Sequence, residues 1–366
     1  MKKHSKTLTD VSKRMMIEQG MNMVAGLDLG DKYSHVCLID LDGRIVESKK
    51  IRTSAPALEK YFSGWTAMRV VFEAGTHANW IYRLLERLGH EVLMADARRL
   101  ALITHSLSKD DRSDAERLAQ LGLLMPEMLN PVQPCSLEVQ HDRAVLKARD
   151  TLIATRTKLI NSVRGTLKSF GYRLPSCDGS AFTKKAAAHI PAELATLRPL
   201  LLVIQHVTDE IHRYDKRIEQ LCERYPATRR LRSIRGVGPI TALAFVLNLN
   251  NDARLLRTSR DAGPRVGLRP KRRESGARAP ELSITKSGDR MLRRLLVQCS
   301  QYILGRHGED SALRRWGLRL AERGGKSAKR KAIVAVARKL AVLLHVLWKR
   351  DIDFDPFYGT DLRQAA

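Results

Sequence analysis

The strongest constraint on the fold is a series of short apolar segments, in residues 21–125, that alternate with amphipathic ones. Short runs rich in Val, Ile and Leu predict strands, and apolar residues repeated every three or four positions predict helices. Asp42-Gly43 predicts a two-residue hairpin. The expected strands are Val24–Leu29, Tyr33–Leu41, Arg44–Arg52, Arg69–Ala74 and Glu91–Ala95, and the expected helices are Pro56–Trp65, Trp80–Leu88 and Arg112–Leu124. This order predicts an RNase H-like α/β domain.

Residues 140–225 predict long helices, the first from about His141 to Phe170. In the second, apolar residues step alternately by three and four, as in the a/d seam of a coiled coil. The seam consists of Ile204, Val207, Ile211, Tyr214, Ile218, Leu221 and Tyr225. Such a seam fits an intramolecular helical hairpin and a dimerising coiled coil equally well, so the sequence leaves both open.

Positive charge is concentrated in one third of the chain. Residues 226–350, which predict a mostly helical region, hold 30 Lys and Arg and 8 Asp and Glu, whereas the other residues hold 35 and 31. A merely soluble basic surface would spread this excess more evenly. Its concentration instead favours binding to a polyanion, of which nucleic acid is the commonest.

Other features exclude several classes of protein. The five cysteines are scattered without a CxxC pair, which argues against a disulfide framework or a thiolate zinc site. No apolar run approaches the roughly 20 residues of a membrane helix. We therefore expect a cytoplasmic protein with no membrane partner. The expected divisions are a flexible basic tail (1–20), an α/β domain (21–125), a helical or coiled-coil segment (140–225), a basic helical domain (226–350) and a second tail (351–366).

Four carboxylates of the α/β region form the first candidate site. Asp28 ends the first expected strand, Glu73 ends the fourth, and Asp111 and Asp114 share one face at the start of the last helix, as Asp110 and Asp114 also would. Clustered carboxylates require cations, and oxygen ligands favour Mg²⁺ or Mn²⁺. Taken singly, each residue is more often a turn acceptor or a helix cap; their combination favours a metal site.

The basic third contains the second candidate site. The segment GVGPITA (236–242) resembles the turn of a helix-hairpin-helix motif, in which backbone N–H groups contact a phosphate, although an ordinary helix–helix turn fits equally well. Ser275 follows three cations that could hold a phosphodiester. The residue type alone gives no reason to prefer a nucleophile over a turn serine. The nucleic-acid-binding candidates are Gly236, Gly238, Arg269, Lys271, Arg272, Arg273, Lys286 and Arg290.

Together these motifs resemble a known family. The combination of Asp28, Glu73 and the Asp111/Asp114 pair with GVGPITA, GLRPKRRESG (267–276) and ITKSGDRMLRRLL (284–296) is similar to the bridge-RNA-guided insertion-sequence transposases, collinearly from about residue 22 to residue 350. The resemblance implies a RuvC-like domain with Asp28, Glu73, Asp111 and Asp114 as its DEDD carboxylates, and a transposase domain in which Ser275 becomes covalently joined to DNA. It also implies donor and target DNA, a structured guide RNA and a homo-oligomer as partners.

One segment departs from that pattern, since 261–267 is rich in Gly and Pro where the family suggests a smoother helix. Two other functions remain to be distinguished from a transposase. A metal-dependent nuclease of the Holliday-junction type would use the carboxylates without a serine intermediate, but it would not need the basic third. A non-catalytic nucleic-acid binder would not need all four carboxylates.

Overall fold

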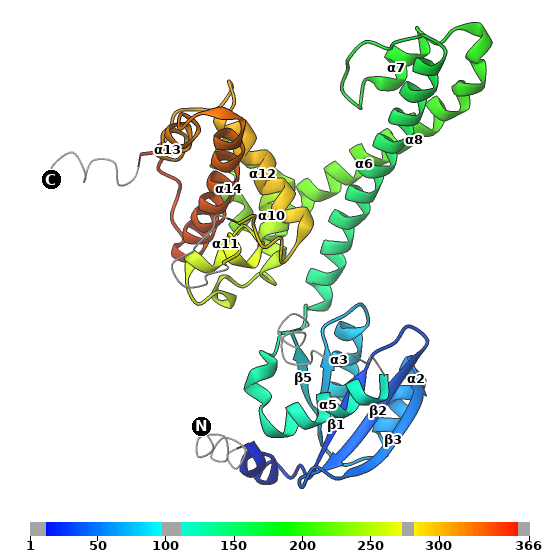
Figure 1. Ribbon diagram of the computed structural model, residues 1–366, viewed down its shortest axis with the longest axis vertical. Helices are drawn as coiled ribbons and strands as arrows, with labels where there is room; N and C mark the ends of the chain where they lie inside the picture. Colours follow the sequence, from blue (N-terminus) through cyan, green and yellow to red (C-terminus); the bar gives the residue numbers. More distant parts are fainter. Residues whose placement is uncertain (1–11, 97–110, 273–281, 358–366) are drawn as a thin grey trace, which may run out of the picture. The chain divides into compact units, whose positions relative to one another are not determined.

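The computed structural model describes residues 12–96, 111–272 and 282–357, and the chain divides into two compact units at Cys135/Ser136 (Figure 1). The first unit is α/β and the second is helical. No helix in the described ranges is long and apolar enough to cross a membrane.

The first unit contains one five-stranded sheet in the order β3-β2-β1-β4-β5. Strands β1 to β3 are antiparallel neighbours, whereas β4 is parallel to both β1 and β5. Its elements are β1 (Met23–Asp28), β2 (Tyr33–Asp40), β3 (Ile45–Arg52), α2 (Ala55–Phe62), β4 (Arg69–Glu73), α3 (Ala78–Arg87), β5 (Glu91–Ala95), α5 (Asp111–Leu124) and the 3-10 turn η1 (Pro126–Leu129). All eight strands and helices expected in this region are present in the expected order.

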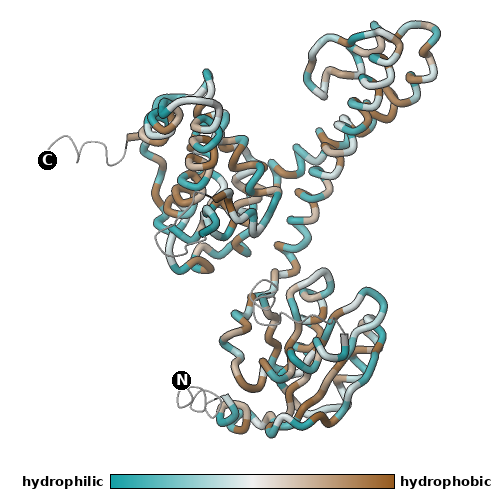
Figure 2. Tube along the Cα trace, in the orientation of Figure 1, coloured by the Kyte–Doolittle hydropathy of each residue, from teal (hydrophilic) through white to brown (hydrophobic). Residues whose placement is uncertain are grey.

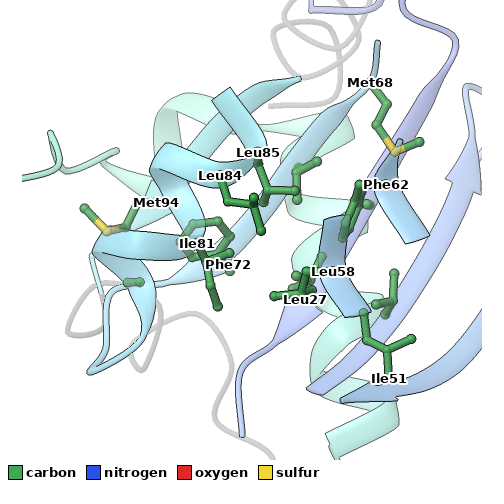
Figure 3. Packing of buried hydrophobic residues seen from close by; sticks show 14 of the residues in the cluster. Leu27, Ile51, Leu58, Phe62, Met68, Phe72, Ile81, Leu84, Leu85 and Met94 are labelled. Atoms are coloured by element: carbon green, nitrogen blue, oxygen red, sulfur yellow. The ribbon is translucent and has the colours of Figure 1, made fainter. Parts of the chain in front are cut away.

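The sheet is covered on both faces because its central strands are apolar on both sides. Side chains such as Leu27 and Phe72 pack with α2 and α3 in one core, seen from close by in Figure 3. Val24 of β1 and Val71 of β4 pack with α5 in a second core on the other face. This alternation follows from the two-residue period of a strand.

Two local details differ from expectation. The β2–β3 hairpin has a longer loop than the expected two residues, because Gly43 adopts φ +83° and the Asp40 carboxylate accepts the N–H groups of Asp42 and Arg44 (2.9 and 2.8 Å). Residues 12–18, expected to be part of a flexible tail, are helical, and Met16 is fully buried in the core against α5. The burial of Met16 and the hydrogen bond from Arg69 Nη1 to Ser12 Oγ (3.0 Å) dock this helix onto the domain.

The second unit begins with a helical hairpin made by α6 (Leu137–Ser169) and α8 (Arg198–Arg224), with α7 (Phe182–Ala187) and the 3-10 helix η2 (Ala192–Leu197) at its tip. Figure 2 shows hydrophobic and hydrophilic residues alternating along both helices. Ile204, Ile211 and Ile218 of the seam are at most 2% exposed in the single chain. The seam is therefore packing within one chain, in favour of the intramolecular hairpin.

The remainder of this unit is a helical bundle, in which residues Thr241 to Leu247 of helix α10 are all buried. Its elements are α9 (Ala227–Leu231), α10 (Pro239–Asn248), η3 (Ala253–Leu255), η4 (Ser259–Asp261), α11 (Ala262–Arg265), α12 (Arg290–Leu304), α13 (Ala312–Ala321) and α14 (Gly325–Arg350). Buried His345 ties α14 to two of the short helices, through Ser259 Oγ at 2.9 Å and the Ala253 carbonyl at 2.8 Å. The Gly- and Pro-rich segment 261–267 contains the short helix α11, where Gly263 lies against Arg338.

Candidate nucleic-acid-processing sites

Asp28 and Glu73 end neighbouring parallel strands at the same level of the sheet. The register pairs Leu27 of β1 with Phe72 of β4, and Asp28 and Glu73 are the next residues on each strand. The carboxyl ends of parallel strands meet at one edge, which is where open α/β sheets place their ligands. Asp28 is half-buried and Glu73 is exposed, so this edge offers two carboxylates to solvent.

Helix α5 brings Asp114 to the same edge. A Cβ atom on Gly26 would lie 1.9 Å from the Ala115 carbonyl oxygen, and one on Gly122 would lie 2.3 Å from Val71. The helix therefore runs against the sheet with its first turn toward the carboxyl end of β1. Asp114 is half-buried in that turn, with Arg117 Nη1 3.4 Å from its carboxylate.

The position of the remaining acids is only partly defined. Asp111 begins α5, but its side chain and all of Asp110 lie outside the described residues. Among the residues that are described, no three Asp, Glu, His or Cys side chains are gathered closely enough to hold a metal ion. The donor set, composed only of oxygen atoms, nevertheless has the chemistry that a hard divalent cation selects.

At the opposite ends of these elements, a buried arginine fixes β4. Arg69 forms a bidentate pair with Glu91 (2.7 and 3.2 Å), and its Nη1 donates to the Gly122 carbonyl and to Ser12 Oγ (2.9 and 3.0 Å). The guanidinium therefore ties β4 to β5, to α5 and to the N-terminal helix. These hydrogen bonds fix the position of β4, which ends in Glu73, relative to α5, which carries Asp114.

The sequence-based search missed an Asp–His pair beside the carboxylates. His77, at the N-terminus of α3, places Nε2 3.5 Å from Asp31 Oδ1, and the indole N–H of Trp80 donates to His77 Nδ1 at 3.2 Å. Because an indole can only donate, Nδ1 accepts and Nε2 carries the ring hydrogen that faces Asp31. The pair connects the loop after Asp28 with the loop after Glu73. The sequence offered one signal for this pair. Asp31 lies three residues after Asp28, and His77 lies four residues after Glu73.

In the second unit, the turn between α9 and α10 contains both candidate glycines. Gly236 has φ +97°, and a Cβ there would lie 2.7 Å from the ring of Tyr302, so this position requires glycine for packing as well as for conformation. Gly238 is exposed at the N-cap of α10, with Pro239 at the first helical position. The first N–H groups of a helix have no intrahelical acceptor, so this turn presents backbone donors. Such geometry suits a phosphate-binding turn, and it also suits an ordinary helix–helix turn.

The segment before and the segment after the serine-containing region pair with each other. Pro270 and Ile284 form an antiparallel bridge, Lys271 N donates to the Ser283 carbonyl (3.0 Å), and Thr285 N donates to the Arg269 carbonyl (2.8 Å). This pairing brings together exposed cations that are apart in sequence. They are Arg269, Lys271 and Arg272 on one side and Lys286 and Arg290 on the other. Arg273 and Ser275 lie outside the described residues.

The backbones around Gly267 and Gly288, next to this paired segment, lie in close contact. A Cβ on Gly267 would lie 2.1 Å from the Ser287 carbonyl oxygen, and one on Gly288 would lie 1.8 Å from the Arg265 carbonyl oxygen. Arg293 of α12 donates to the carbonyls of Val266 (3.0 Å) and Ser287 (2.9 Å). Sequence reasoning did not select these residues, because their roles depend on contacts between backbones.

Comparison with known proteins gives matches in both units. Residues 25–171 match the transposase family DEDD_Tnp_IS110, and residues 228–316 match the transposase family IS116/IS110/IS902. The transposase for insertion sequence element IS1111A of Coxiella burnetii is 27% identical over 340 residues, covering 89% of this chain and 90% of the relative. The transposase for element IS1328 of Yersinia enterocolitica is 28% identical, covering 77% of this chain and 84% of the relative. The putative transposase y4pF/y4sB of Sinorhizobium fredii is 30% identical, covering 81% of this chain and 76% of the relative.

Proposed function

The chain belongs to the IS116/IS110/IS902 family of transposases, enzymes that act on DNA, and we propose that it cuts and rejoins DNA with a metal-binding carboxylate site and a serine nucleophile. The observation that carries the proposal is the convergence of Asp28, Glu73 and the first turn of α5 on one edge of the sheet. The strand order β3-β2-β1-β4-β5 supports an RNase H/RuvC-like fold for this domain.

Asp28, Glu73, Asp111 and Asp114 would hold the divalent ion, Mg²⁺ or Mn²⁺. When bound, such an ion activates the attacking oxygen and stabilises the leaving oxygen of a phosphodiester. The chain's own contribution is positional. The contact of Gly26 with α5 and the Arg69 pair set the helix against the strands, and the Asp31–His77 pair links the two loops that follow Asp28 and Glu73.

Ser275 is the proposed nucleophile. Its oxygen forms a bond to phosphorus as one backbone P–O bond of the DNA breaks, and the serine proton passes to the departing sugar oxygen. Attack by another DNA hydroxyl on the phosphoserine reverses these steps and rejoins the strand. The cations gathered by the pairing of Arg269–Lys271 with Ser283–Thr285 support this assignment, since they suit a phosphodiester.

The proposed partners are donor DNA, target DNA, a structured guide RNA and further copies of the chain. The net charge of residues 226–350 and the α9–α10 turn at Gly236 and Gly238 support nucleic-acid binding by the second unit. The guide RNA and the oligomer rest on the resemblance of the motifs. The proposed domains are the α/β domain at 21–125, the helical segment at 140–225 and the transposase domain at 226–350, as expected from the sequence. The helix at 12–18, expected in a flexible tail, packs onto the α/β domain.

A metal-only nuclease of the Holliday-junction type is not favoured, because the relatives across both units are transposases. Mn²⁺ binding, measured by electron paramagnetic resonance, tests the carboxylate site without requiring a DNA substrate. Asp28→Asn and Glu73→Gln should each weaken Mn²⁺ binding about tenfold or more, since even the loss of a group that only supports a metal ligand costs about tenfold. Asp209→Asn, at an exposed position of α8, is the control and should bind Mn²⁺ normally. Unchanged Mn²⁺ binding in both site variants would refute the metal site.

A further inference from the structure

Two aromatic residues flank a rigid turn at the tip of the α6–α8 hairpin. Helix α6 ends in a Schellman motif, in which Gly171 N donates to the Lys168 carbonyl (3.0 Å) and Tyr172 N donates to the Leu167 carbonyl (2.9 Å). Gly171 has φ +85°, the conformation that this motif requires. The backbone from Leu167 to Tyr172 is therefore fixed, with Phe170 and Tyr172 on either side of the glycine. Figure 1 shows α7 beside this end of the hairpin.

Neither aromatic ring is used to build the core of the tip. Phe170 is 59% exposed and Tyr172 is 39% exposed, whereas Phe182 of α7 is 1% exposed. The buried cluster consists of Val163, Leu167, Phe182, Ala186, Ile190, Leu194, Leu197, Leu201 and Ile204. A phenylalanine this exposed contributes little to the core, so most of its ring surface is accessible to a partner.

The ring of Tyr172 is held in place by a second contact. Its hydroxyl donates to Glu193 of η2 at 2.5 Å. The same hydrogen bond raises the pKa of Tyr172 and lowers the pKa of Glu193, so the tyrosine remains the donor and the glutamate remains ionised near neutral pH. The phenol is therefore anchored by its edge while part of the ring remains exposed. An anchored ring loses less conformational entropy when a flat ligand stacks on it.

The tip is positively charged. Residues 164–198 contain six basic side chains and two acidic ones, Asp178 and Glu193. Arg164 is engaged inside the tip, where it donates to the Leu174 and Pro175 carbonyls. The exposed cations are Lys168, Arg173, Lys184, Lys185 and Arg198. Lys168 and Arg173 lie within two residues of an exposed aromatic ring.

We propose that the turn Lys168–Arg173 is a binding site for single-stranded nucleic acid, with bases stacked on Phe170 and Tyr172 and phosphates contacted by Lys168 and Arg173. Aromatic planes beside cations are the combination with which proteins bind unpaired bases. In a duplex the base faces are already stacked and cannot reach these rings. A second copy of the tip would bring like charges together, which opposes a homotypic contact. The site is independent of the proposed chemistry at Asp28 and Ser275.

Photo-crosslinking of the full chain tests where the bases lie. Two sets of single-stranded oligonucleotides of about twelve nucleotides are used, within the usual size of such sites. The RNA arm of the experiment carries 5-iodouridine and the DNA arm carries 5-iododeoxyuridine. Crosslinked peptides containing Phe170 or Tyr172 are expected with single strands, and the arm with the higher yield identifies the natural partner as RNA or DNA. Equal crosslinking by a duplex of the same sequence, or crosslinks confined to other peptides, would overturn the proposal.

Binding affinity at high salt, where phosphate contacts contribute less, tests the stacking itself. Phe170→Ala should weaken single-strand binding about fivefold, as expected for the loss of one stacked base, and Phe170→Trp should restore it. Leu202→Ala is the matched control, because Leu202 is an exposed apolar residue (72%) on the same hairpin. Equal loss in Leu202→Ala, or a smaller particle mass by light scattering in Phe170→Ala, would overturn the proposal and assign the surface to a protein contact.

Discussion

Gly26 of β1 and Ala115 of α5 lie backbone against backbone, so that a Cβ atom on Gly26 would meet the Ala115 carbonyl oxygen at 1.9 Å and the Ala119 nitrogen at 2.5 Å. No side chain separates the strand from the helix at this point. The contact determines how far the first turn of α5 can approach the carboxyl end of β1. The position of Asp114 relative to Asp28 therefore depends on a residue that has no side chain.

Gly26→Ala should separate the helix from the sheet. The backbone atoms that a methyl group would meet cannot move away cheaply, so we expect a loss of about 3 kcal/mol in the free energy of unfolding, the upper part of the range for overpacking. Chemical denaturation measures this loss. Gly165→Ala in α6 is the control, since its added Cβ has no atom within 4 Å, and alanine should there stabilise the helix by about 0.5–1 kcal/mol. Equal stabilities of the two variants would contradict the proposed packing.

His90 makes the stability of the first unit dependent on pH. Its Nδ1 accepts the Met68 N–H (3.3 Å) and its Nε2 lies 3.3 Å from the Phe62 carbonyl, to which it can donate. Burial lowers the pKa of His90, because protonation would charge the buried ring and turn a second N–H against the Met68 donor. The unfolded chain therefore binds a proton more readily than the folded chain. This stabilisation is complete above the unfolded pKa of about 6.5 and decreases as the pH falls below it.

The measurement is the melting temperature of the wild type and of His90→Gln between pH 7.5 and 5.5. The wild type should lose more stability on acidification than His90→Gln does. His206→Gln, at an exposed position of α8, should keep the pH dependence of the wild type. An identical pH dependence in all three proteins would show that His90 is not the titrating group.

Truncation of Ile211, which is 2% exposed in the seam between α6 and α8, should destabilise the hairpin without changing the size of the particle. Ile211→Ala creates a cavity within one chain and should cost about 2–5 kcal/mol. Calorimetry measures the stability and light scattering measures the mass. A reduced mass in a folded variant would instead assign the seam to a contact between subunits.

The elements whose signals lie within a few neighbouring residues could be predicted from the sequence. The short continuous apolar runs of β1 and β4 and the three-and-four spacing in α8 predicted these elements closely. A central strand covered on both faces is apolar throughout, whereas burial of one face of a helix imposes the helical period. The predicted length of the β2–β3 loop was wrong, because this length depends on hydrogen bonds to the Asp40 carboxylate and on the positive φ of Gly43. The helical residues 12–18 were missed, because a single buried Met16 leaves no periodic pattern.

The sequence was enough to select candidate acids for the site, but not the contacts that position them. Acidic residues at the ends of apolar strands mark Asp28 and Glu73, and the parallel register of β1 and β4 brings these ends together as expected. The contacts of Asp31 with His77 and of Arg69 with Gly122 join segments far apart in sequence. Such contacts depend on tertiary distances, which no local pattern encodes. The role of Ser275 remains a prediction, since this residue lies outside the described ranges.

The most direct test of the proposed chemistry is the detection of protein covalently joined to DNA. Wild-type protein is incubated with labelled DNA that spans the ends of its element, in the presence of Mg²⁺, and is then denatured and separated by size. We expect a labelled adduct whose phosphorylated peptide contains Ser275. Ser275→Ala and Asp114→Asn should each lack the adduct while still binding DNA. Cleavage by Ser275→Ala at the wild-type rate would contradict the serine mechanism and restore the metal-only nuclease, whereas an adduct at Ser283 or Ser287 would retain the mechanism and correct the residue.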